Sequence, residues 1–200
     1  MLSGIAFAIL FIVGVMLGSD TPEPDAPDAE WTEWFDDGGH RGLQIVSIFL
    51  MALAALALVV FITGLVHRLR AASPHHGAVQ LAHGSGMILA AMIAIAGIAI
   101  NQISGAIEFG DAPIPEADTL RIAEQLGYGI LLIPGGWFAA LTVAAASIAA
   151  RGTGVFPNWL VTTGYVAAVI LIFSFIFIPM VVLPLWVLAA AISVGRRSVA

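Results

Sequence analysis

The chain lacks cysteine and lysine and carries little charge. Its 200 residues include no cysteine, seven basic residues that are all arginine, and only 10% charged residues in total. The lack of cysteine excludes disulfides, thiolate metal sites and cysteine nucleophiles. Soluble domains carry about 25% charged and about 45–50% apolar residues, whereas 60% of this chain is hydrophobic. An ordinary soluble globular protein is therefore excluded.

Sequence motifs of enzymes and of nucleic-acid-binding proteins are also lacking. The chain has no H-E-x-x-H or C-x-x-C-H motif and no G-x-S-x-G elbow of a serine hydrolase. His83 and Ser85 are close in sequence, but residues two apart on a helix do not face each other. No run of basic residues suited to nucleic acid is present. We therefore expect no nucleic-acid partner, and the sequence favours a protein that is not an enzyme.

The apolar residues form long runs, as in integral membrane proteins. We predict an all-α fold, a polytopic transmembrane helical bundle of six spans that forms a single domain over residues 1–200. The predicted spans cover about residues 2–18, 43–66, 78–105, 120–150, 158–177 and 181–194. The last two form a hairpin, because one helix over 158–194 would be about 55 Å long and the hydrocarbon core is about 30 Å thick.

Charge is distributed unevenly along the chain. All thirteen acidic residues lie within residues 20–37 and 108–124. Five arginines lie elsewhere, at Arg68, Arg70, Arg151, Arg196 and Arg197. The positive-inside rule places these arginines in the cytoplasm, so we expect both termini to be cytoplasmic. The acidic loops 19–40 and 106–119 then lie outside the cell membrane, where Arg41 and Arg121 are expected to pair with acidic neighbours.

The predicted fourth span contains Pro134-Gly135-Gly136 near its middle. Proline removes a backbone donor, and glycine lowers the resistance of a helix to bending. Two interpretations follow. The segment is either a static kink that makes room for another helix, or a discontinuous helix that lines a ligand or ion site.

Polar residues mark the outer halves of the third and fourth spans. A charged residue at the bilayer centre costs at least ~2.5–3.5 kcal/mol on insertion scales, so we expect Glu124 to lie near the outer interface or to pair with Arg121. Asn101 lies on a stripe of small and polar residues that suits close helix packing. The candidates for a ligand pathway are Asn101, Glu124, Tyr128, Pro134, Gly135 and Gly136.

Histidines gather near the expected inner surface. His67 and His83 would end two adjacent spans at the same depth, where paired imidazoles can ligate a metal or a haem. The alternative is a set of interfacial histidines in contact with headgroups and water. The sequence leaves the cofactor unknown, with His67 and His83 as the metal candidates.

The first outer loop contains Trp31, Trp34 and Phe35 at helical spacing. Since tryptophan is favoured at the headgroup level, we predict a short helix that anchors the loop at the membrane surface. The alternative is a cation site formed by the neighbouring acidic residues and His40.

Three stretches carry a resemblance to known sequences. They are Gly127–Trp137 (GYGILLIPGGW), Arg151 followed by Phe156–Leu160 (FPNWL), and Ile178-Pro179 followed by Leu183–Trp186 (LPLW). These stretches resemble uncharacterised multi-span integral membrane proteins of actinobacterial type. The resemblance covers roughly the C-terminal half and implies a multi-span fold. It implies no activity, cofactor or site residue.

The sequence therefore predicts a multi-pass membrane protein with membrane lipid as its partner. The favoured function is a non-enzymatic accessory subunit, in contact with other subunits or copies of itself, or a binder of lipid or another apolar ligand. One alternative is a small transporter or channel that uses the fourth span. The other is a redox membrane protein that holds haem or metal at the histidines.

Overall fold

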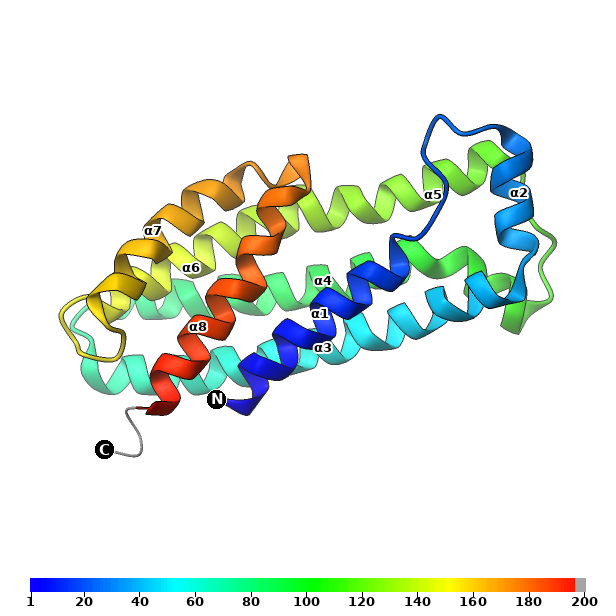
Figure 1. The fold of residues 1–200 in the computed structure, drawn as a ribbon. Helices are drawn as coiled ribbons and strands as arrows, with labels where there is room; N and C mark the ends of the chain where they lie inside the picture. Colours follow the sequence, from blue (N-terminus) through cyan, green and yellow to red (C-terminus); the bar gives the residue numbers. More distant parts are fainter. Residues whose placement is uncertain (197–200) are drawn as a thin grey trace.

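The computed structural model describes residues 1–196, so Arg197 and the side chain of Arg196 lie outside the described part. Within residues 1–196 the chain is helical and contains no strand. Its elements form an elongated bundle (Figure 1). Four helices are long and apolar enough to cross a membrane: Gly38–Ala72, His76–Gly110, Ala117–Ala150 and Ile178–Gly195. The predicted all-α fold is confirmed at this level.

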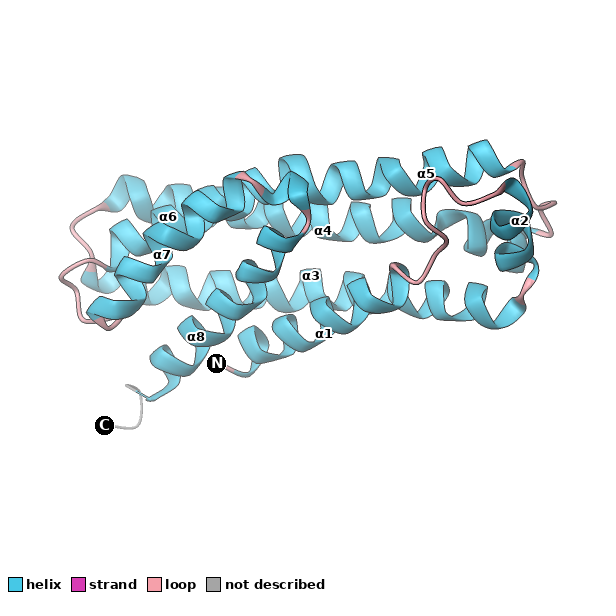
Figure 2. Cartoon of the chain, turned by 45° about the horizontal axis from the view of Figure 1, so that its top comes forward, coloured by secondary structure: helices cyan, strands magenta, loops and turns pink. Residues whose placement is uncertain are grey.

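The elements follow one another in a simple order along the chain. They are α1 (Leu2–Gly18), α2 (Asp28–Asp36), α3 (Gly38–Ala72), α4 (His76–Gly110), α5 (Ala117–Ile130), the π-helical segment η1 (Leu131–Gly135), α6 (Gly136–Ala150), α7 (Asn158–Ile172), the 3-10 turns η2 (Ser174–Ile176) and η3 (Ile178–Val181), and α8 (Val182–Arg196). Figure 2 shows α3, α4 and the continuous α5–α6 rod running side by side. Helix α1 packs along α3, α7 along α6, and α8 along α1.

The long helices extend beyond the predicted spans. Helices α3 and α4 have 35 residues each, which corresponds to about 52 Å. The hydrocarbon core is only about 30 Å thick. Spans 43–66 and 78–105 are therefore the apolar middle parts of longer helices, because hydropathy detects the lipid-facing stretch and not the polar turns that continue the helix.

Residues 158–194 form the predicted hairpin. Helix α7 ends at Ile172, and not at residue 177 as predicted, because the backbone leaves the helical region at Phe173 and turns at Phe177, where φ is +71°. The turn lies about halfway along the bundle (Figure 1), beside η1. Helix α8 then runs back along α1 toward the end of the bundle where the chain begins.

A buried polar network links α1, α3 and α4. Ser47 Oγ donates a hydrogen bond to the Gly14 carbonyl over 2.8 Å, and Asn101 Nδ2 donates to Ser47 Oγ over 3.3 Å. One helical turn away, Ser104 Oγ donates to Gln44 Oε1. All four of these polar side chains are at most 1% exposed. The polar face of α3 and the stripe of α4 that carries Asn101 therefore pack against each other.

The two ends of the bundle carry opposite charge. The acidic end holds residues 19–37 and 108–124 (Figure 1). Arg41 pairs there with Glu108 over 2.6 Å, which confirms its expected pairing. The other end holds the loops after α3 and α6, the start of α1 and the end of α8.

Candidate ligand site between α1, α5 and the α7–α8 turn

The Pro-Gly-Gly sequence forms one wide turn in an otherwise continuous helix. Residues Leu131–Gly135 are π-helical, and the flanking Ile130 and Gly136 keep right-handed helical φ and ψ angles. The discontinuous-helix interpretation of the fourth span is therefore wrong. Single π turns inside α-helices are frequently found at functional sites, so this turn favours a site in the neighbouring part of the bundle.

The wide turn makes room for the end of α7. A Cβ atom added to Gly136 would lie 1.6 Å from Ser174 Oγ and 3.2 Å from the Leu171 carbonyl oxygen. Ser174 Oγ donates a hydrogen bond to the Leu132 carbonyl, which lies in the π segment. The Pro-Gly-Gly sequence therefore acts as a packing device, as the static-kink interpretation predicts.

A polar pocket of about 260 Å³ lies at the acidic end, between α5 and the segment that follows α1. Its central group is the Glu124 carboxyl, whose residue is only 7% exposed. Thr21 Oγ1 donates a hydrogen bond to Glu124 Oε1 over 2.5 Å. The segment after α1 thus folds over α5 and covers this carboxyl group from the outside.

Arg121 holds the segment in place at the rim of the pocket. Its guanidinium lies 2.8 Å from Asp28 and 3.0 Å from Asp118, and it donates to the Ala26 carbonyl over 2.6 Å. Its central carbon lies 5.7 Å from the centre of the Trp31 ring, within range of a cation–π interaction. The predicted pairing of Arg121 with acidic neighbours is confirmed, and the neighbours are Asp28 and Asp118. The alternative prediction, a pair between Glu124 and Arg121, is wrong.

Helix α2 packs into the protein. Trp31 and Phe35 are each 2% exposed and contact Ala117 and Leu120 of α5. The predicted short helix is confirmed, but these two rings are not headgroup anchors, because they are buried against α5. Trp34 stacks on His40 with a centroid distance of 4.8 Å.

Tyr128 forms the inner wall of the polar pocket. Its hydroxyl donates a long hydrogen bond of 3.5 Å to the Gly18 carbonyl at the end of α1. Its ring meets the Phe177 ring edge to face, with centroids 6.1 Å apart. Phe177 belongs to the α7–α8 turn, so this aromatic pair connects the polar pocket to the hairpin.

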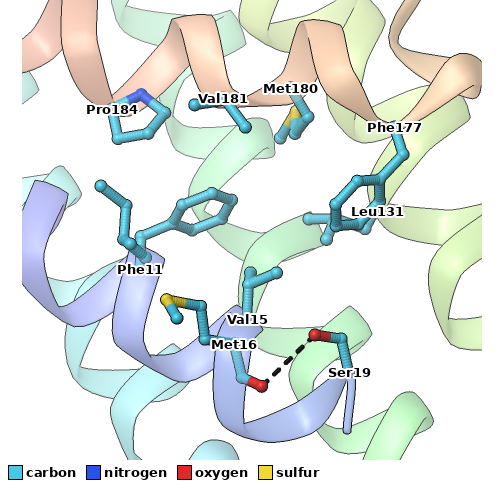
Figure 3. Close-up of a pocket in the computed structure, with 10 residues that line it drawn as sticks. Phe11, Val15, Met16, Ser19, Leu131, Phe177, Met180, Val181 and Pro184 are labelled. Carbon is cyan, nitrogen blue, oxygen red and sulfur yellow. Dashed lines mark hydrogen bonds between the residues drawn. The ribbon is translucent and has the colours of Figure 1, made fainter. Parts of the chain in front are cut away.

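Phe177 also lines an apolar cavity of about 180 Å³ (Figure 3). Its walls come from α1, the π segment, the α7–α8 turn and α8. The lining residues are Phe11, Ile12, Val15, Met16, Ser19, Leu131, Phe177, Met180, Val181 and Pro184. Met16 is 66% and Val181 47% exposed, so the cavity opens onto an apolar part of the surface.

The structure brings only some of the predicted site residues together. Glu124 and Tyr128 line the same pocket, and Pro134, Gly135 and Gly136 form or adjoin the π turn on the same helix. Asn101 instead belongs to the buried network between α1, α3 and α4, where it bonds to Ser47 and to the Gly97 carbonyl.

The two candidate metal ligands do not share a cavity. His67 lines a cavity of about 390 Å³ together with residues of α3, the α6–α7 loop and α8, and His83 is not among the lining residues. Within residues 1–196, no three histidine, aspartate or glutamate side chains are grouped as a metal ion would require. The described residues therefore provide no set of ligands for a metal at His67 and His83. They also provide none for a cation in the first acidic loop.

Several residues of the site were not predicted from the sequence. Thr21 lies in a Pro-rich stretch without periodicity, and Leu131 is one apolar residue among many. The apolar pattern predicts that Phe177 ends a helix, and not that it forms a turn. The signal available for Phe177 was Pro179 two residues later, because proline marks the end of a helical segment.

Fold and site together define an all-helical protein with four helices that can cross a membrane and a polar pocket next to an apolar cavity. No family model matches the chain, and comparison with curated proteins and with solved structures gives no match.

Proposed function

We propose that this chain is a multi-pass membrane protein that binds a lipid or another apolar ligand in the cavity between α1, η1 and α8. The supporting observation is the cavity of about 180 Å³ and its almost entirely apolar lining. An apolar cavity of about 150 Å³ can hold a molecule of benzene, so this one suits a short stretch of acyl chain. Its mouth opens among exposed apolar side chains, which contact lipid when the bundle lies in a bilayer.

The proposal requires no chemical step. The expected role as an accessory subunit, with other subunits or a second copy as partner, stays a prediction. A transporter is less well supported, because the polar pocket leads to an apolar cavity and the helix at Pro134 is continuous.

The proposed topology has six spans, with both chain ends in the cytoplasm. The arginine-containing loops support this orientation through the positive-inside rule. Helices α1 and α7 have 17 and 15 residues, about 25 Å and 22 Å, so they are shorter than the hydrocarbon core. Local thinning of the bilayer accommodates such short spans at a modest free-energy cost.

Filling the cavity mouth tests the proposed function. The full-length protein is purified in mild detergent, and co-purifying lipid is identified and counted by mass spectrometry. We expect the wild-type chain to retain lipid in a stoichiometric amount and Val181→Trp to lose most of it, because the indole occupies the mouth of the cavity.

The matched control is Val169→Trp, which places the same side chain at an exposed position of α7 outside the cavity. This variant is expected to retain lipid as the wild type does. A wild-type chain without bound lipid, or a Val181→Trp chain that keeps it, contradicts the proposed function.

A further inference from the structure

The polar pocket and the apolar cavity are neighbours. Ser19, at the end of α1, lines both of them. Tyr128 lines the polar pocket and Phe177 lines the apolar cavity, and their two rings are in contact. Glu124 and Leu131 lie seven residues apart on the same helical rod (131 − 124), which corresponds to about 10 Å. This distance is similar to the one between the headgroup of a phospholipid and the upper part of its acyl chain.

The charge of the polar pocket selects the headgroup. Glu124 is almost fully buried and lines the pocket. Its Oε1 accepts from Thr21, and no hydrogen bond to Oε2 is found among the described residues. The surrounding end of the bundle carries all thirteen acidic residues. Glu23 and Glu124 line the pocket together with Arg121, whose guanidinium is already paired with Asp28 and Asp118. The excess of negative charge concentrates ligands of the opposite sign, so this pocket favours a cationic group that donates hydrogen bonds.

The aromatic pair stands at the passage between the two spaces. Phe177 has φ +71° and ψ −57°, near the rare and strained γ-turn conformation. Such strained residues cluster at ligand clamps and switch regions.

We infer that the two spaces form one site for a membrane phospholipid with an ammonium headgroup, as in phosphatidylethanolamine. The ammonium lies beside Glu124 and Thr21, and an acyl chain passes the Tyr128–Phe177 pair into the cavity between α1 and α8. The occupant is a phospholipid, because the cavity opens among apolar side chains at the surface of the bundle. This inference rests on the proposed function and adds the headgroup class to it.

Headgroup competition tests the inference. The full-length wild-type chain is offered an equimolar mixture of phosphatidylethanolamine and phosphatidylglycerol with identical acyl chains, and bound lipid is counted by native mass spectrometry. We expect enrichment of phosphatidylethanolamine. Glu124→Gln should lower the enrichment about tenfold, the effect of losing one charge-assisted hydrogen bond. Glu33→Gln removes an exposed carboxylate at the same end of the bundle and should leave the enrichment unchanged.

Two results overturn the inference: equal binding of the two lipids by the wild type, or an unchanged enrichment in Glu124→Gln. If Glu124→Gln does not fold, the wild-type chain is tested with a lipid whose headgroup amine is N-acetylated. Acetylation removes the positive charge and should abolish the enrichment. Unchanged binding of the acetylated lipid overturns the inference. A failure of the proposed function gives a different result from a failure of this inference. If the proposed function is wrong, Val181→Trp retains lipid whatever its headgroup.

Discussion

At the scale of single residues, glycine sets the approach of α5 to α4. A Cβ atom added to Gly127 would lie 2.5 Å from the backbone nitrogen of Ile100 and 2.8 Å from its Cα. These are backbone atoms of another helix, so no rotamer change relieves the contact. Gly127 adjoins Tyr128, which lines the polar pocket, so the same stretch of α5 both packs on α4 and contributes to the pocket.

Gly127→Ala is expected to destabilise the fold by about 1–3 kcal/mol or more, the cost of overpacking a tight contact. Gly129→Ala is the matched control, because a Cβ at Gly129 meets no atom within 4 Å. Gly129→Ala is expected to stabilise the helix by up to about 1 kcal/mol, because alanine has a higher helix propensity than glycine. Thermal unfolding of the purified variants measures both, and a Gly127→Ala chain as stable as Gly129→Ala contradicts the proposed packing.

At the scale of elements, the π segment and the α7–α8 turn form one unit. Ser174 bonds to the Leu132 carbonyl and occupies the space that a side chain at position 136 would need. The turn that carries Ser174 also carries Phe177. The wide helical turn thus positions the aromatic residue that separates the polar pocket from the cavity.

A double-mutant cycle tests this coupling. Gly136→Ala is expected to cost about 1–3 kcal/mol through its clash with Ser174, and Ser174→Gly about 1 kcal/mol through the lost hydrogen bond. The double variant should be more stable than the sum of these costs implies, because neighbouring substitutions that relieve a shared clash are not additive. Chemical unfolding in detergent gives the three free energies, and strict additivity would disprove the coupling.

At the scale of the whole molecule, charge separates the two ends of a bundle whose 35-residue helices α3 and α4 are longer than a hydrocarbon core is thick, about 30 Å. The acidic end includes α2, which packs on α5, and it covers the polar pocket. In the proposed orientation this end projects from the outer surface. A headgroup from the outer leaflet would then reach Glu124 without crossing the hydrocarbon core.

The absence of cysteine allows a direct test of orientation. Two single-cysteine variants are labelled in intact cells with a membrane-impermeant maleimide. They are Ala29→Cys, at an exposed position of α2, and Ala72→Cys, at the exposed end of α3. We expect labelling of Ala29→Cys in intact cells and of Ala72→Cys only after permeabilisation. The reverse pattern shows the opposite orientation, and labelling of both in intact cells rules out the six-span topology.

Patterns along the sequence predicted the helices because a stretch of apolar residues is a local signal. They also indicated that the stripe with Asn101 packs against another helix, since small and polar residues recur at helical spacing. They did not predict that α7 ends at Ile172, because Phe173 and Phe177 are as apolar as the helix before them. At that turn Ser174 packs against Gly136, which is a contact between distant segments.

The sequence by itself determined the helical class, the apolar stretches and the separation of charge, because composition, hydropathy and charge order can be read along one chain. It also indicated Glu124 and Tyr128 as unusual residues. Only the tertiary structure decided that Glu124 meets Thr21, 103 residues away, and that Tyr128 meets Phe177. The physical reason is that a pocket is formed by side chains from separate elements, whose relative positions depend on how the helices pack.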